Sequence, residues 1–173
     1  MRVVAGRWRG RLLRAPKDAR VRPTSDKVRQ AWLNIVRRDV PGARVLDLFA
    51  GSGALGIEAL SQGAAACDFV ELNGPSLRAL GDNLAALGIG DDEARVRRGD
   101  ALRFVETLEP LAYDVAFADP PYAMDAATRV AERWIEVPFA AVLGVEHDVR
   151  AEMPAGGDLR RYGTTAVTFY RVP

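Results

Sequence analysis

The feature that most constrains the fold is a regular alternation of strand-like and helix-like segments between residues 44 and 146. Short β-prone runs predict the strands Arg44–Phe49, Ala66–Glu71, Ala94–Arg98, Tyr113–Ala118 and Ala140–Glu146. The segments between them predict helices over Gly53–Gln62, Pro75–Leu87, Ala101–Leu108 and Asp125–Trp134. Such alternation is typical of an α/β fold in which helices cover both faces of a mostly parallel sheet.

The two ends of the chain depart from this alternation. Near the C-terminus, Leu159–Tyr162 and Thr165–Arg171 predict two strands that form an antiparallel hairpin. At the N-terminus, Met1–Pro16 predicts a small β-hairpin, and a helix capped by Thr24 or Ser25 follows it and ends before Pro41. We therefore divide the chain into an N-terminal extension, residues 1–38, and a main domain, residues 39–173.

Composition places the chain among ordinary globular proteins. Its 173 residues are 49% hydrophobic and 27% charged, which suits one domain that folds without disulfides or metals. No apolar run approaches the roughly 18 residues of a membrane span, and the N-terminus lacks the apolar region of a signal peptide. The single cysteine, Cys67, cannot form an internal disulfide. We expect a cytoplasmic protein without a metal site.

The net charge of +1 conceals an asymmetric distribution of charge. Residues 1–38 contain 12 lysines and arginines against two acids, whereas residues 39–173 contain 12 against 21. A basic extension on an acidic domain suggests a polyanionic partner, although it can also be a merely solvated arm. The residues that we assign to nucleic-acid binding are Arg2, Arg7, Trp8, Arg9, Arg11 and Arg22. We expect Arg20, Lys27 and Arg29 to continue this basic surface; Trp8 has the alternative of packing against the domain.

A glycine-rich turn follows the first predicted strand. The segment Gly51–Gly56 matches G-x-G-x-x-G, and Glu71 follows Gly51 by 20 residues, where a ribose-binding carboxylate lies in nucleotide-binding α/β folds. A nucleotide-dependent oxidoreductase and a ligand-free tight turn remain alternatives. Asp47, inside the strand, favours a cationic ligand such as S-adenosylmethionine over an anionic pyrophosphate, because a buried acid is costly without a partner. Asp100 can accept a hydrogen bond from an adenine amine or cap the next helix.

The sequence Asp-Pro-Pro-Tyr, residues 119–122, is the most specific signal in the chain. It directly follows the fourth predicted strand, and its prolines fix the backbone and leave carbonyl groups free. Asp119 and the Pro120 carbonyl can accept the two hydrogens of an exocyclic amine while Tyr122 stacks on the base. Positioning of the amine nitrogen in line with a methyl donor then accelerates transfer. The alternative is a proline-rich loop without a site.

These motifs resemble the first and fourth motifs of class I S-adenosylmethionine-dependent amino-methyltransferases. The segments Val3–Gly10, Arg22–Arg29, Tyr162–Thr165 and Phe169–Arg171 narrow the resemblance to the RsmD family of bacterial 16S ribosomal-RNA guanine-N2 methyltransferases. The resemblance implies a Rossmann-like class I methyltransferase fold with a mostly parallel seven-stranded sheet. One departure is Asn73-Gly74-Pro75, which we expect to alter the entry to the next helix but not the chemistry.

The resemblance also implies which residues form the site. The cofactor would be held by Thr24, Asp47, Phe49, Ala50, Gly51, Ser52, Gly53, Glu71, Leu72, Asp100 and Ala101. The base and the chemistry would be carried by Asp119, Pro120, Pro121 and Tyr122. The expected substrate is a guanine of 16S ribosomal RNA within a small-subunit particle, and the enzyme would be a monomer. The alternatives are an adenine-N6 methyltransferase acting on DNA or RNA and a noncatalytic RNA-binding factor of ribosome assembly. We assign no role to the single histidine, His147.

Overall fold

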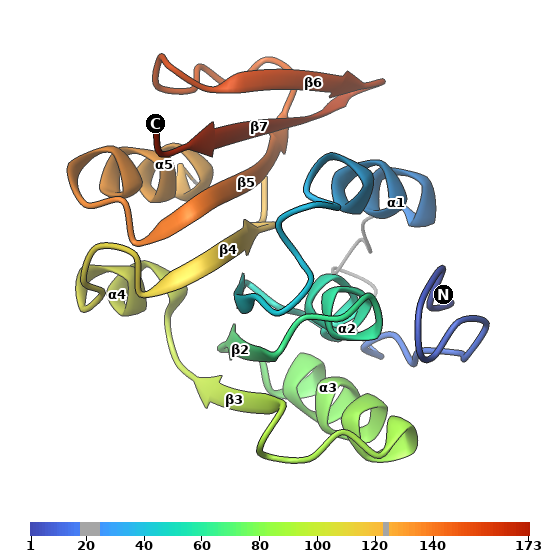
Figure 1. The fold of residues 1–173 in the computed structure, drawn as a ribbon. Coiled ribbons are helices and arrows are strands. Elements are labelled where there is room, and N and C mark those ends of the chain that lie inside the picture. Colours follow the sequence, from blue (N-terminus) through green and yellow to red (C-terminus); the bar gives the residue numbers. More distant parts are fainter. Residues whose placement is uncertain (18–24, 123–124) are drawn as a thin grey trace.

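The computed structural model describes residues 1–17, 25–122 and 125–173. These residues form a seven-stranded sheet in the order β3-β2-β1-β4-β5-β7-β6 (Figure 1). Strands β1 to β5 are parallel to one another, and β7 is inserted antiparallel between β5 and β6. The strand bounds are β1 Arg44–Leu48, β2 Ala66–Glu71, β3 Ala94–Arg98, β4 Tyr113–Ala118, β5 Ala140–Asp148, β6 Asp158–Tyr162 and β7 Thr165–Arg171.

Helices cover both faces of the sheet, as the alternation predicts. Their bounds are α1 Asp26–Ile35, α2 Ala54–Ser61, α3 Gly74–Leu87, α4 Ala101–Glu106 and α5 Ala126–Glu136. One hydrophobic core joins α1, α2 and α3 to the sheet, and a second joins α4 and α5 to its opposite face (Figure 1). Successive strand residues enter opposite cores: Val115 and Phe117 of β4 face the first, and Ala116 and Ala118 face the second.

The predicted α/β class, the parallel sheet and the closing hairpin are confirmed. Four strands have the predicted bounds, and the other elements of the main domain differ by two residues or fewer at each end. The helix of the extension is shorter than expected, because α1 ends at Ile35 rather than near Pro41. Its N-cap is Ser25, whose Oγ accepts a hydrogen bond from the Val28 amide at 3.2 Å.

Helix α1 packs on the sheet through Trp32. The indole ring is fully buried and makes edge-to-face contacts with Phe117 of β4 and Phe169 of β7. Gly144 of β5 lies directly beneath it, and a Cβ there would come within 2.3 Å of the indole nitrogen. A glycine at this position therefore lets the helix lie close to β5, near the ends of the strands that carry the predicted site.

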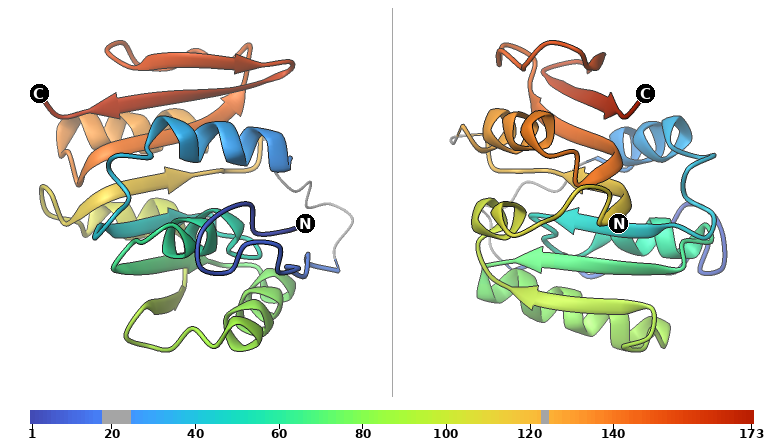
Figure 2. Two further views of the ribbon diagram at one scale, coloured as in Figure 1. Left: turned by 45° about the vertical axis from the view of Figure 1, so that its right-hand side comes forward. Right: turned by 60° about the vertical axis from the view of Figure 1, so that its left-hand side comes forward.

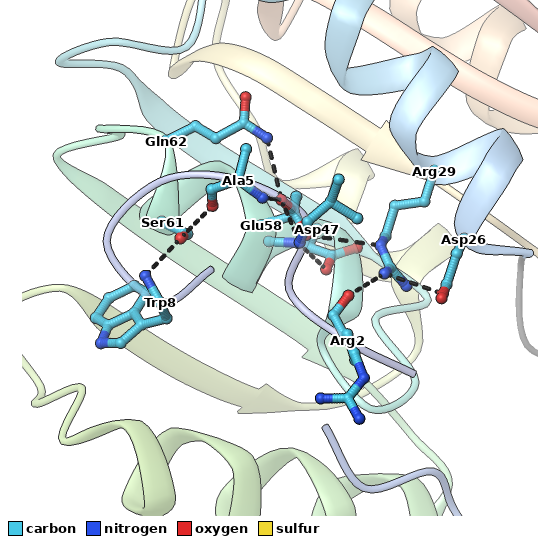
Figure 3. Close-up of polar contacts among 11 residues, drawn as sticks. Arg2, Ala5, Trp8, Asp26, Arg29, Asp47, Glu58, Ser61 and Gln62 are labelled. Atoms are coloured by element: carbon cyan, nitrogen blue, oxygen red, sulfur yellow. Dashed lines mark hydrogen bonds and ion pairs between the residues drawn. The ribbon is translucent and has the colours of Figure 1, made fainter. Parts of the chain in front are cut away.

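The N-terminal segment, residues 1–17, forms a turn-rich arm that lies against α2 and near α3 (Figure 2). It has less regular structure than the predicted hairpin, with one isolated bridge between Arg2 and Leu12. Glu58 of α2 fastens it, because this buried carboxylate accepts hydrogen bonds from the amides of Val4 and Ala5 at 2.9–3.1 Å (Figure 3). Ser61 adds a further pair of contacts, since its Oγ donates to the Ala5 carbonyl at 2.6 Å and accepts from the Trp8 amide at 3.0 Å.

Arg29 of α1 joins the arm from the other side. Its guanidinium lies 3.8 Å from Glu58, forms an ion pair with Asp26 and donates to the Arg2 carbonyl at 2.6 Å (Figure 3). The expectation that Arg29 belongs to an exposed basic surface is wrong, because the residue is only 1% exposed. Its charge is neutralised inside the protein, where a buried ion is tolerated when it is paired.

The arm and the main domain share a core. Val3, Trp8 and Leu13 are buried in the cluster that contains Val45 of β1 and Ile57 of α2. The division into an extension and a main domain at residue 38 therefore stays a prediction from the sequence. In the structure, residues from both parts pack into the same hydrophobic core. Within the described ranges no helix has the length and apolar character needed to cross a bilayer.

Candidate active site

Four carboxylates gather where parallel strands end at one edge of the sheet. Asp47 lies in β1, Glu71 ends β2, Asp119 directly follows β4, and Glu146 lies near the end of β5. The Asp119 amide donates to the Leu48 carbonyl of β1 at 3.5 Å, so the fourth-strand motif lies beside the glycine-rich turn. Ligands of open α/β sheets bind at this edge.

The glycine-rich turn uses its two glycines for different purposes. Gly51 (φ 57°) and Gly53 (φ 83°) both have left-handed backbone conformations that favour glycine. A Cβ on Gly53 would come within 2.3 Å of Leu80 in α3, so this glycine is required for packing. A Cβ on Gly51 would meet no described atom within 4 Å, so its backbone borders open space. Phe49 also has a positive φ, 57°, a strained conformation that is common at binding sites.

Asp47 is 2% exposed and accepts a hydrogen bond from the Gly56 amide in the first turn of α2 at 2.9 Å. Burial raises its pKa well above the usual range; the Gly56 hydrogen bond opposes this shift, and the charges of Asp119 and Glu71 add to it. The Gly56 amide is therefore a partner for Asp47 within the protein, besides the cationic ligand that the sequence predicts. A positively charged ligand nearby would still stabilise the ionised carboxylate against the cost of burial and the repulsion of Asp119 and Glu71.

Glu71 connects two turns through backbone amides. Its Oε2 accepts from the Gly51 amide at 2.7 Å, and its Oε1 accepts from the amides of Leu72 and Asn73 at 2.8 and 2.7 Å. The Leu72 side chain is exposed beside it. Asn73 caps α3 by accepting from the Ser76 amide at 3.0 Å, so the unusual Asn73-Gly74-Pro75 forms an ordinary helix start.

Asp100 follows β3 and caps α4. Its Oδ1 accepts from the Arg103 amide at 3.1 Å, as the structural alternative predicts. The side chain is exposed, so it is also accessible to a ligand. Ala101, by contrast, is buried in the second core, and Ser52 is buried in the turn. These two residues can offer a ligand little more than backbone atoms.

The segment Asp119–Tyr122 leaves the sheet at the end of β4. Pro120 is buried, whereas Pro121 and Tyr122 are exposed. The Tyr122 hydroxyl donates to Glu146 Oε1 at 2.9 Å and lies 2.6 Å from Thr165 Oγ1 of β7. Burial and the charge and hydrogen bond of Glu146 raise the pKa of Tyr122 above its usual value, against an opposing Thr165 contact, so the phenol stays protonated at neutral pH.

Glu146 and Thr165 are the neighbours of this segment that sequence reasoning missed. They lie in β5 and β7, far along the chain from Tyr122, and no short motif marks them. In this part of the chain, the sequence draws attention only to His147, which directly follows Glu146. His147 itself is buried and contacts Thr168 Oγ1 of β7 through Nε2 at 2.8 Å, which links the two strands.

The arm differs from the predicted nucleic-acid surface. Trp8 is 6% exposed and packs in the first core, which corrects its assignment to base stacking and supports the alternative that it packs against the domain. Arg7 lies over the Trp8 ring and forms a 2.8 Å ion pair with Glu93, and Arg11 donates to the Ala86 carbonyl at 2.8 Å.

Two other expected RNA contacts stay exposed. Arg2 donates to the Gly10 carbonyl at 3.0 Å, and the Arg9 side chain has no partner among the described residues. Thr24, Arg20 and Arg22 lie outside the described residues. The ranges that the structure covers contain no group of three or more side chains able to hold a metal ion.

Comparisons with known proteins identify relatives of this chain. Residues 1–171 match the family described as Conserved hypothetical protein 95. Ribosomal RNA small subunit methyltransferase D of Haemophilus influenzae is 31% identical over 178 residues, which cover 99% of this chain and 92% of the relative. The Escherichia coli protein of the same name is 39% identical over 122 residues, covering 70% of this chain and 60% of that protein.

Solved structures share the fold over nearly the whole chain. A hypothetical protein of Thermus thermophilus has a TM-score of 0.84 and 31% identity, with 99% of both chains covered. An RNA methyltransferase of Salinibacter ruber, solved with S-adenosyl-L-homocysteine, has a TM-score of 0.66 at 16% identity over 88% of this chain and 94% of its own, which shows the fold alone. The chain therefore has the class I methyltransferase fold and belongs to the family described as Conserved hypothetical protein 95, the RsmD family that its motifs resemble.

Proposed function

We propose that this protein is an S-adenosylmethionine-dependent methyltransferase that modifies the exocyclic N2 of a guanine in 16S ribosomal RNA. The observation that carries the proposal is the position of Asp119–Tyr122 beside the glycine-rich turn, where the Asp119 amide reaches the Leu48 carbonyl. An acid–proline–proline–aromatic segment next to a nucleotide-type turn suits the transfer of a group from a cofactor to a base amine. Relatives named as small-subunit rRNA methyltransferases support this interpretation.

The residues of the turn fit the proposed cofactor. The open backbone side of Gly51 can receive a ligand, Glu71 can accept ribose hydroxyls, and the exposed Leu72 can contact an adenine ring. Asp100 can accept from the adenine amine. Asp47 supplies negative charge beneath the turn, which favours a ligand with ammonium and sulfonium groups. When bound, S-adenosylmethionine supplies an electrophilic methyl group.

The fourth-strand segment then acts on the base. The Asp119 carboxylate and the Pro120 carbonyl accept the two hydrogens of the guanine amine, which favours a pyramidal nitrogen with its lone pair directed outward. Tyr122 stacks on the base, which must leave its own stack to arrive there. Asp119 also stabilises the positive charge that develops on nitrogen and accepts the departing proton. Positioning provides most of the acceleration.

RNA would be held by exposed basic side chains of the arm, of α1 and of β6. Arg2 and Arg9 of the arm are exposed, and Arg7 and Arg11 can contact phosphates only by giving up contacts with the domain. Lys27 of α1 and Arg161 of β6 are exposed cations whose side chains have no partner among the described residues. A small-subunit particle as substrate, a monomeric enzyme and a cytoplasmic location complete the proposal.

The test maps methylated nucleosides in 16S ribosomal RNA from a strain that lacks the gene. The expected result is the loss of one N2-methylguanosine, which the wild-type gene restores and an Asp119→Ala gene does not. Loss of an N6-methyladenosine instead would favour the adenine alternative. Unchanged methylation together with an assembly defect would favour the noncatalytic factor.

A further inference from the structure

Glu146 is placed beside the proposed catalytic segment by the register of two neighbouring strands. Ala118 of β4 pairs with Val145 of β5, so the next residues along each strand are Asp119 and Glu146. Neighbouring strands lie about 4.8 Å apart. Residues paired in register point to the same face, and Val115 with Val142 identifies this face as the one that α1 covers.

The Glu146 side chain is 5% exposed, and the structure connects it to the residue proposed to stack on the base. Its Oε1 accepts from the Tyr122 hydroxyl at 2.9 Å, and Tyr122 itself is 47% exposed. A base that stacks on the exposed face of Tyr122 therefore arrives within reach of the Glu146 carboxylate. A carboxylate has two oxygens and several acceptor positions, so it can accept a hydrogen bond from a base in addition to its contacts within the protein.

The purine amines differ in the ring nitrogen next to them. The N2 amine of guanine is flanked by N1–H, a hydrogen-bond donor, whereas the N6 amine of adenine is flanked by an N1 lone pair, an acceptor. Asp119 and the Pro120 carbonyl engage only the amine, so they cannot distinguish the two bases. A carboxylate next to them accepts from the guanine N1–H and repels the adenine N1.

We propose that Glu146 determines the base specificity of this enzyme by accepting the N1–H of the target guanine. The inference rests on the proposed function, because it identifies which purine the same site accepts. Glu146 would touch the substrate, so its role differs from that of Thr165, which contacts only the Tyr122 hydroxyl among these residues.

A purely structural role must be separated from this one, because Glu146 also contacts Tyr122. The variants Glu146→Gln, Tyr122→Phe and their combination form a double-mutant cycle. The control is Glu132→Gln, which makes the same exchange on the exposed side of α5. The assay uses small-subunit particles from the gene-deletion strain with labelled S-adenosylmethionine, and cofactor affinity and thermal unfolding are measured in parallel.

Base recognition predicts that Glu146→Gln lowers kcat/KM by about tenfold or more both in the wild-type background and in the Tyr122→Phe background, with cofactor affinity unchanged. If the effect of Glu146→Gln disappears in the Tyr122→Phe background, Glu146 acts only through the tyrosine and the proposal is overturned. Wild-type protein that methylates no guanine would instead refute the proposed function.

A second measurement does not depend on how well the variant folds. Particles are reconstituted with 2-aminopurine at the mapped guanine; this base keeps the 2-amino group but has a lone pair at N1. Wild-type protein should methylate it about tenfold or more slowly than guanine. Glu146→Gln, whose amide can donate to N1, should narrow that ratio. Equal wild-type rates on the two bases would overturn the proposal.

Discussion

The two halves of the site hold their carboxylates by different means. In the half proposed to bind the cofactor (the cofactor half), Asp47 and Glu71 accept hydrogen bonds from backbone amides of neighbouring turns. In the half proposed to bind the base (the base half), Tyr122 and Glu146 contact each other through side chains, and Thr165 joins them from β7. The first arrangement is part of the local backbone fold. The second exists only because three strands meet at the same edge.

This difference separates two kinds of substitution. A change in the cofactor half that leaves the turn amides without their acceptor should lower stability and cofactor affinity together. A change in the base half leaves the turns intact, so the rate of methyl transfer or the choice of base should change alone.

Asp119→Ala should lower the rate of methyl transfer by about 10²–10³-fold, because it removes both an acceptor for the amine and the charge that stabilises the developing cation. Cofactor affinity and the thermal midpoint should change little. Single-turnover kinetics and calorimetric titration with S-adenosylmethionine measure the two quantities. Normal turnover would show that Asp119 takes no part in the chemistry. A loss of cofactor affinity as large as the loss of rate would show that substitutions in the base half also act on the cofactor half.

Gly53→Ala should destabilise the protein by about 2–4 kcal/mol, because the methyl group meets Leu80 and the backbone has a positive φ. Gly51→Ala should cost only about 1–2 kcal/mol, since the backbone strain is similar but the space is open. Chemical denaturation provides both values. Equal losses of stability would show that packing against Leu80 does not distinguish Gly53 from Gly51.

Glu71→Gln should lower cofactor affinity about tenfold and also destabilise the protein by about 1–2 kcal/mol, because an amide cannot accept from all three backbone N–H groups as a carboxylate does. Titration calorimetry and denaturation of the same sample measure both effects, with Glu132→Gln as the control. Weaker binding at unchanged stability would mean that Glu71 acts on the ligand alone.

The cofactor-free protein should lose stability through Asp47 as pH rises. Burial raises the pKa of this carboxyl in the folded state, so its contribution is greatest below the ordinary Asp pKa of about 3.9 and is lost as pH rises through the higher folded value. The difference in free energy of unfolding between Asp47→Asn and wild type should therefore grow with pH in favour of the variant. A difference that is constant with pH would contradict this account.

The sequence predicted the elements of the fold well because they depend on local patterns, and the alternation of strand-like and helix-like runs defined the strands. The role of Glu71 as a ribose-binding carboxylate stays a prediction; the structure shows that it accepts a hydrogen bond from the Gly51 amide. The register of β4 with β5 and the insertion of β7 are long-range, so Glu146 and Thr165 had no local signal. Likewise, the burial of Trp8 depends on docking against α2, which the charge pattern of the arm does not indicate.

The sheet order also sets a sequence of events during synthesis. The strands of the cofactor half, β1 to β3, and β4 beside them are complete once residue 118 has left the ribosome. The base half must wait for β7, because Thr165 of that strand contacts Tyr122 and β7 itself lies between β5 and β6. A nascent chain can thus assemble its glycine-rich turn well before the contact between Tyr122 and Thr165, which forms only after β7 has been synthesised.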